Sequence, residues 1–330
     1  MTPEPSLESH KNSEAQPVSP DLLTKLDFPT GPIFGLDWSP DSRMLASAGY
    51  DQIKLWDTIT QKESAILQGH SNIWGLAWSP GGSSLASASL DGSVKLWNSA
   101  GWQNTATLET GRAFCISWSP DGKRLAVGTA VFTDETNPET FSGKSQIWDL
   151  ETLQLVRELS LPSLVISTAW SPDGRAIAIG QWDGKLAFWG GVSDKVLKSA
   201  AATNARSDVN GLAWSPDGRM LATAQQDGKV RIWNPETAEI LRTLEGHTGW
   251  SRGLAWRPDG TMLASTGEDA AIRMWSIKNG QELACLTPGS LPIWSLKWSP
   301  DGNWLAAGTG IFGSEPVGGN VLIYKFNLPT

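Results

Sequence analysis

The sequence predicts an all-β protein in which seven small antiparallel sheets stack radially into one ring. Composition is the first reason: the 330 residues include 19 Trp against 8 Phe and 2 Tyr. A repeated unit that needs an indole at a fixed place would produce this excess. The second reason is a phrase close to Trp-Ser-Pro-Asp-Gly, which recurs at intervals of 40 to 52 residues, a period typical of repeat architectures. The third is a second aromatic residue that follows each phrase.

The seven repeats align on these two aromatic positions. The first position is occupied by Trp38, Trp78, Trp118, Trp170, Trp214, Trp256 and Trp298. The second is occupied by Trp56, Trp97, Trp148, Trp189, Trp233, Trp275 and Tyr324. The spacing between them is 18 or 19 residues in five repeats, but 30 in the third and 26 in the seventh, so these two repeats carry insertions.

Each repeat is expected to form four short strands, which we call a, b, c and d. In the fifth repeat, apolar runs at 208–214, 220–224, 229–233 and 238–244 are separated by turn residues. Ser-Pro-Asp-Gly suits a type I turn between strands a and b, because Pro presets φ at its second position. Asp-Gly pairs at Asp91, Asp183 and Asp227 indicate tight turns between strands b and c. No stretch has a convincing helical period.

The chain divides into a polar tail and one ring-shaped domain. Residues 1–20 are rich in Pro, Ser and Glu, and we expect them to be disordered. Residues 21–330 hold the seven repeats. Only KFNLPT follows Tyr324, too little for a last strand d. Residues 22–28, LLTKLDF, resemble the d segments elsewhere, so we expect this N-terminal strand to complete the seventh sheet and to remove an open edge.

These repeats resemble the WD-repeat family, and bacterial members of it in particular. The resemblance spans residues 21–330 and depends on Gly-His pairs before strand a, the Trp-Ser-Pro-Asp-Gly phrase and Trp-Asp pairs such as Trp56-Asp57 and Trp148-Asp149. It implies a seven-bladed β-propeller with a hydrogen-bonded tetrad in each blade. Two tetrads look complete in this sequence: His70, Ser87, Asp91 and Trp97, and His247, Ser265, Asp269 and Trp275. Blades three and seven lack the Asp, so we expect them to be looser.

Several functional classes are disfavoured. A net charge of −8 argues against general nucleic-acid binding, and no apolar run is long enough for a membrane span. The string 249–253 fits G-x-S-x-G and 308–313 fits G-x-G-x-x-G, but neither has the helix that these motifs need. We therefore expect no enzyme activity, no metal and no cofactor. Two cysteines without CxxC spacing and no export signal favour the cytoplasm.

The best candidate site is the mouth of the central channel. In this family strand a lines the channel, so the residue four before each first Trp crowds the mouth on the face formed by the d–a and b–c connections. That column reads Phe34, Trp74, Phe114, Ile166, Asn210, Arg252 and Trp294. Nearby connections add Tyr50, Leu90, Trp182, Gln226 and Glu268, with Trp250 and Arg112 two positions before the column. Blades seven, one, two and three thus contribute four successive aromatic residues, although rings at such positions also pack between blades.

We expect a non-catalytic interaction scaffold that binds a peptide or protein segment at this mouth. Aromatic residues and Arg are favoured at interface centres. The predicted binding residues are Phe34, Tyr50, Trp74, Leu90, Arg112, Phe114, Trp182, Trp250, Arg252 and Trp294. The insertions at 131–142 and 311–319 should rise from the same face. The alternatives are a propeller that binds a small ligand or carbohydrate, or a subunit of a larger regulatory complex. A monomer or a subunit of a hetero-complex is expected.

Overall fold

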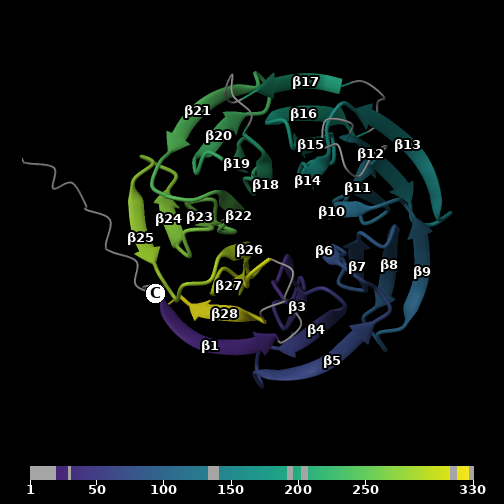
Figure 1. Cartoon of the computed structure of the whole chain (residues 1–330), viewed down its shortest axis with the longest axis horizontal. Helices are drawn as coiled ribbons and strands as arrows, with labels where there is room; N and C mark the ends of the chain where they lie inside the picture. The colour runs from purple at the N-terminus through teal and green to yellow at the C-terminus, as the bar shows by residue number, and fades with distance from the viewer. Residues whose placement is uncertain are drawn as a thin grey trace, which may run out of the picture.

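The computed structural model describes residues 20–28, 31–132, 141–191, 196–201, 207–312 and 318–326. These residues form seven four-stranded antiparallel sheets arranged as the blades of a closed ring, and they contain no helix (Figure 1). The predicted β-propeller is confirmed. The proposed tail, residues 1–20, lies outside the described residues except for its last member, Pro20.

The strands follow the repeat order from strand a to strand d. Blade one has β2 (Gly35–Trp38), β3 (Met44–Ala48), β4 (Gln52–Asp57) and β5 (Lys62–Gln68). Blade two has β6 (Ile73–Trp78), β7 (Ser84–Ser89), β8 (Ser93–Asn98) and β9 (Asn104–Glu109). Blade three has β10 (Ala113–Trp118), β11 (Arg124–Phe132), β12 (Phe141–Asp149) and β13 (Gln154–Leu161). Blade four has β14 (Val165–Trp170), β15 (Ala176–Gln181), β16 (Lys185–Gly190) and β17 (Val196–Ala201).

The remaining blades complete the ring. Blade five has β18 (Val209–Trp214), β19 (Leu221–Gln225), β20 (Val230–Asn234) and β21 (Glu239–Leu244). Blade six has β22 (Ser251–Trp256), β23 (Met262–Gly267), β24 (Ile272–Ser276) and β25 (Glu282–Leu286). Blade seven has β26 (Ile293–Trp298), β27 (Trp304–Thr309), β28 (Gly319–Lys325) and β1 (Asp21–Phe28). The first strand of each blade lies at the centre of the ring and the fourth at the rim (Figure 1).

Blade seven is assembled from both parts of the chain, as predicted. Strand β1 pairs antiparallel with β28, in a register that runs from Asp21 opposite Lys325 to Phe28 opposite Gly319. The side chain of Phe28 is fully buried in the core between blades seven and one. The ring is therefore closed without a covalent link, and the rim of blade seven gains its outer strand from the N-terminal side.

The first Trp of a repeat joins neighbouring blades. The indole N–H of Trp118 donates to the carbonyl of Ala77 over 2.9 Å, so blade three is bonded to blade two. Trp214 and Trp256 make the same contact to the blade before them. The indole N–H of Trp38 in blade one donates to the carbonyl of Lys297 in blade seven over 3.1 Å. Four of the seven first-Trp indoles thus donate hydrogen bonds between blades, and one of these bonds spans the closure.

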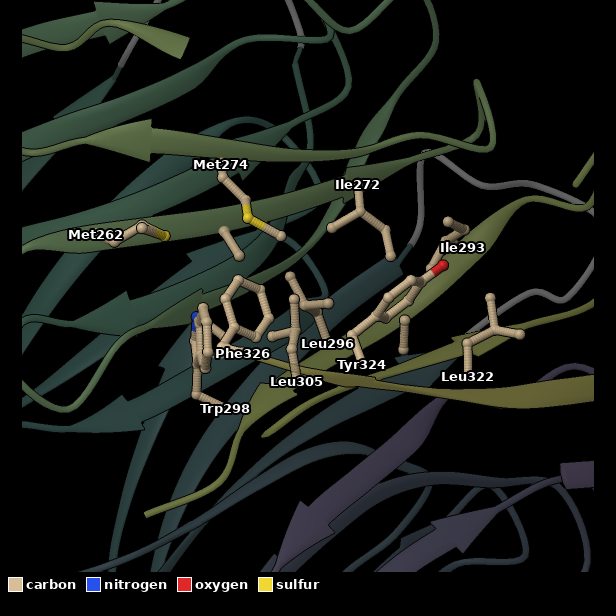
Figure 2. Packing of buried hydrophobic residues seen from close by; sticks show 13 residues of the cluster. Met262, Ile272, Met274, Ile293, Leu296, Trp298, Leu305, Leu322, Tyr324 and Phe326 are labelled. Atoms are coloured by element: carbon tan, nitrogen blue, oxygen red, sulfur yellow. The ribbon is translucent and has the colours of Figure 1, made fainter. Parts of the chain in front are cut away.

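Apolar residues fill the space between successive blades. Figure 2 shows the cluster between blades six and seven, where Met274 of β24 and Leu305 of β27 are fully buried. Tyr324 takes the place of the second Trp in blade seven and is 4% exposed. Its ring lies among these aliphatic side chains (Figure 2), and burial raises its pKa to about 12. The repeat therefore needs a large ring at this position more than it needs an indole.

The tetrad residues lie together in blades two and six, but with different bonding. In blade six, the Oγ of Ser265 bonds Nε2 of His247 and the indole of Trp275, each over 2.8 Å, and Asp269 bonds Nδ1 of His247. In blade two, His70 bonds Asp91 over 2.8 Å and Trp97 bonds Ser87 over 2.9 Å. Nε2 of His70 has no hydrogen-bond partner among the described residues. The second chain of bonds is therefore interrupted between His70 and Ser87.

Blade three replaces the tetrad with a different network. The indole of Trp148 donates to the amide oxygen of Gln146 over 3.0 Å, and the Gln146 amide nitrogen donates to the carbonyl of Thr110 over 3.2 Å. The insertion partly extends the sheet, because Val131 pairs with Ser142 and Phe132 with Phe141. Residues 133–140, and residues 313–317 of the other insertion, lie outside the described residues. The greater looseness of blades three and seven stays a prediction.

Candidate functional site

A cavity of about 320 Å³ lies at one end of the central channel. All seven residues of the predicted column line it, one from each blade. Four further residues, Trp182, Asp208, Trp250 and Phe312, complete its lining. The column residues also line the channel below, so the cavity is the mouth of that channel. We call this cavity the channel mouth.

A β-bulge at the start of strand a directs the column residues. In blade two, Ile73 pairs with Ser89 and Gly75 with Ala88, which leaves Trp74 as the extra residue of the bulge. The same change of register leaves one extra residue in four other blades: Phe114, Ile166, Asn210 and Trp294. In blade six the change of register falls at Arg252 and Gly253. Bulges re-aim a side chain at the end of a sheet. Here the repeated bulge places one side chain of each of these six blades at the channel mouth.

A small residue after the bulge lets the blades approach closely. A Cβ atom on Gly75 would lie 2.8 Å from Cγ2 of Ile116 in the next blade, and one on Gly211 would overlap the main-chain oxygen of Arg252. A larger side chain would therefore push the next blade away. This requirement explains the Gly-Leu and Gly-Leu-Ala runs after several column residues.

Aromatic rings of blades seven, one, two and three form one continuous arc. Phe34 stacks on Trp74 with centroids 4.3 Å apart and an interplanar angle of 4°. Trp294 meets Phe34 edge-on at 5.4 Å, and Phe114 meets Trp74 edge-on at 5.1 Å. The rings do pack against one another across blades. They nevertheless remain half-buried and line the cavity. The column residues therefore pack between blades and also present their rings to the mouth.

The opposite side of the mouth is polar and centred on Arg252. Its guanidinium lies between two rings, 4.7 Å from the centroid of Trp250 and 4.6 Å from that of Trp294. The carboxylate of Glu268 accepts hydrogen bonds from the Nε and Nη2 atoms of Arg252. Asn210 accepts from its Nη1 atom over 3.2 Å. Arg252 thereby ties strand a of blade six to blade five, to blade seven and to its own b–c turn.

Seven of the ten predicted binding residues line the mouth: Phe34, Trp74, Phe114, Trp182, Trp250, Arg252 and Trp294. The other three lie outside its lining. Tyr50 meets Phe34 edge-on at 6.4 Å and flanks the arc. Leu90 is half-buried in the b–c turn of blade two. Arg112 is exposed, and its guanidinium lies 4.8 Å from the ring of Phe132.

Sequence reasoning missed Phe312 as a mouth residue. It follows strand b of blade seven, is 56% exposed, and meets Phe34, Trp74 and Trp294 edge-on with centroids 5.9, 6.0 and 6.4 Å away. The insertion at 311–319 is predicted to rise from this face, but Phe312 is not among the predicted binding residues. An aromatic residue in a b–c connection, as at Tyr50 and Trp182, was the available signal. Asp208, which is 2% exposed, was missed too.

Both enzyme-like strings overlap strands. Residues 251–253 of the G-x-S-x-G string open β22, and Gly308 and Thr309 of the G-x-G-x-x-G string end β27. The two described His residues are both bonded to tetrad carboxylates. No cluster of metal-ligating side chains occurs among the described residues. In the same part of the chain, no helix is long and apolar enough to cross a membrane.

Two models of known protein families match parts of this chain. The model named WD domain, G-beta repeat, matches residues 21–57, 61–98, 154–190, 238–276 and 280–312. A second model, named Anaphase-promoting complex subunit 4 WD40 domain, matches residues 192–251. These matches support the prediction that the chain is not an enzyme.

Curated relatives match part of the chain. The B-type cell cycle switch protein ccs52B of Medicago truncatula is 30% identical over 179 residues, which cover 52% of this chain and 35% of the relative. Protein FIZZY-RELATED 3 of Arabidopsis thaliana is 26% identical with the same coverage. The WD repeat-containing protein slp1 of Schizosaccharomyces pombe is 29% identical over 166 residues, 48% of this chain and 32% of the relative. The chain thus spans about a third of the length of these relatives.

The sources of these relatives do not support the bacterial likeness expected from the repeats, since they are two plants and a yeast. The repeat assignment is supported by the family model, which matches more than half of the chain. Its five matched stretches follow one another along the seven-bladed ring. The chain therefore belongs to the WD40 family of repeat proteins.

Proposed function

We propose that this propeller is a non-catalytic interaction scaffold that binds a peptide or protein segment of a partner at the channel mouth. The observation that carries the proposal is the continuous arc of Trp294, Phe34, Trp74 and Phe114, which lines a cavity open to the d–a face. Each such ring offers roughly 150–250 Å² of contact area. Aromatic residues and Arg clustered at the centre of a surface are typical of binding hot spots.

The relatives point to the setting in which such a scaffold acts. Two are named as a cell cycle switch protein and a FIZZY-related protein, and the second family model is named for a subunit of the anaphase-promoting complex. We propose that this chain, too, works as a regulatory subunit of a protein complex. The likeness covers about half of this chain.

Affinity capture with a matched pair of variants tests the proposal. Trp74→Ala combined with Trp294→Ala removes two rings of the arc. Ile59→Ala removes an apolar side chain that is 74% exposed in the c–d turn of blade one, on the opposite face. Proteins captured by the wild type and by Ile59→Ala, but lost with the double variant, support the proposal. A partner retained equally by all three proteins removes the mouth from consideration.

A further inference from the structure

Three polar side chains of the channel mouth, those of Arg252, Asn210 and Trp294, already have hydrogen-bond partners within the protein. Three nitrogens of Arg252 donate to Glu268 and Asn210. The Asn210 amide nitrogen donates to the carbonyl of Ser251 over 3.0 Å. The indole of Trp294 donates to the carbonyl of Gly310 over 2.8 Å. A ligand rich in hydroxyl groups would have to break these bonds, and breaking a buried bond without replacing it is costly.

The charged groups at the mouth are paired or buried. The carboxylate of Glu268 neutralises Arg252, and the rings of Trp250 and Trp294 cover the guanidinium. The other charged residue of the lining, Asp208, is 2% exposed and offers a ligand little surface. An anionic ligand would have to displace Glu268 from Arg252. A cationic ligand would lose its hydration without meeting an exposed carboxylate of the lining, and such a loss is costly. A neutral group is therefore favoured over both kinds of charged group.

The remaining lining is apolar, and the protein itself places an apolar side chain against it. Phe312 meets three rings of the arc edge-on, the geometry that aromatic pairs prefer, while more than half of its surface stays exposed. The cavity of about 320 Å³ has a size near the lower end for small-ligand pockets, which suits one or two side chains rather than a large ligand.

Resting on the proposed function, we propose that the channel mouth takes a neutral apolar side chain, aromatic or large aliphatic, from a segment of the partner protein. The side chain lies beside Phe312 and against Phe34, Trp74 and Phe114. The neutralised Arg252 forms the opposite wall and does not contact a ligand charge. This assigns the specificity of the mouth to shape and apolar contact.

Saturation-transfer NMR of the full chain with capped amino acids tests this assignment. The probes are the N-acetyl amides of Phe, Leu, Arg and Asp, together with methyl α-glucoside. We expect the Phe and Leu probes to bind and the others not to. Phe34→Ala should weaken the binding of the Phe probe by about 2- to 10-fold, as expected for the loss of one aromatic contact. Ile59→Ala should leave it unchanged.

A second variant tests the role of Glu268. Glu268→Gln removes the carboxylate that occupies Arg252, so this variant should gain binding of the Asp probe while keeping that of the Phe probe. Preference of the wild type for the Arg probe, the Asp probe or the glucoside would overturn the inference and leave the mouth as the binding site. Absence of Phe and Leu binding at the highest soluble probe concentration would also overturn it. Failure of the proposed function would instead appear as partner capture that ignores the mouth variants.

Discussion

The rings of Phe34 and Trp74 lie parallel, 4.3 Å apart, although they belong to adjacent blades. Phe34 precedes β2 of blade one, and Trp74 is the bulged residue of β6 in blade two. Each ring therefore supports the position of the other, and the stack bridges two blades at the channel mouth. The surface that we propose for binding is thus also a contact that stabilises the ring.

This stack predicts energetic coupling between its two rings. In a double-mutant cycle with Phe34→Ala and Trp74→Ala, the free energies of unfolding should depart from additivity by about 0.5–1.5 kcal/mol, the value typical of aromatic pairs. Chemical denaturation of the four proteins measures it. The matched cycle with Phe34→Ala and Ile166→Ala, residues of blades one and four, should be additive within about 0.5 kcal/mol. Equal coupling in both cycles would contradict the pairwise stack.

The two tetrads predict unequal costs for the same substitution. Ser265→Ala leaves both the indole of Trp275 and Nε2 of His247 without their bond, whereas Ser87→Ala affects only the indole of Trp97. Each buried group left without a partner costs about 1–3 kcal/mol. Ser265→Ala should therefore lower the free energy of unfolding more than Ser87→Ala. Equal losses in chemical denaturation would show that the interrupted bond in blade two forms in solution.

Titration of His247 predicts that stability falls in mild acid. Burial lowers the pKa of His247 below its ordinary value of 6.5, despite its bond to Asp269. At a pH between the lowered pKa of the folded chain and 6.5, the unfolded chain binds a proton at His247 that the folded chain excludes. The free energy of unfolding therefore falls as the pH drops below about 6.5. His247→Gln, which does not titrate, should flatten part of this fall in a pH series of melting temperatures. An unchanged slope would assign the acid sensitivity elsewhere.

Asp269 contributes in a different pH range. Burial alone would raise the pKa of Asp269, but hydrogen bonds from His247 and from the main-chain N–H of Thr248 outweigh this and lower it below 3.8. The stability it provides is therefore present above that pH and is lost only as the pH falls through the lowered value. The two groups can thus be separated in one pH series.

Ring closure by β1 predicts a sharp difference between two truncations. Deletion of residues 1–28 removes the outer strand of blade seven together with the buried ring of Phe28, and burial of such a ring is worth about 3–5 kcal/mol. The melting temperature should drop strongly, while deletion of residues 1–20 leaves β1 intact and should have almost no effect. Differential scanning calorimetry compares the two. Truncations that behave alike would contradict closure by this strand.

The repeat made most of the fold predictable, because each first Trp, each turn and each column residue recurs at a fixed offset. The side-chain direction of the column was inferred correctly, but the bulge that produces it was not, since a bulge such as that at Trp74 changes register without changing sequence spacing. Where a repeat departs from the pattern, the sequence does not predict the role of the residues that replace it. Gln146 in blade three and Phe312 in blade seven take roles that depend on three-dimensional neighbours rather than on repeat position.

Binding of a partner through the aromatic arc of the channel mouth can be measured with three proteins. They are the wild type, Trp74→Ala/Trp294→Ala and Ile59→Ala, each titrated by calorimetry with the captured partner segment. If these rings are hot spots worth about 2 kcal/mol or more, the double variant should raise the Kd by at least about 30-fold, with Ile59→Ala unchanged. An unchanged Kd for the double variant, with its folding verified by its melting temperature, would show that the partner does not bind through the arc.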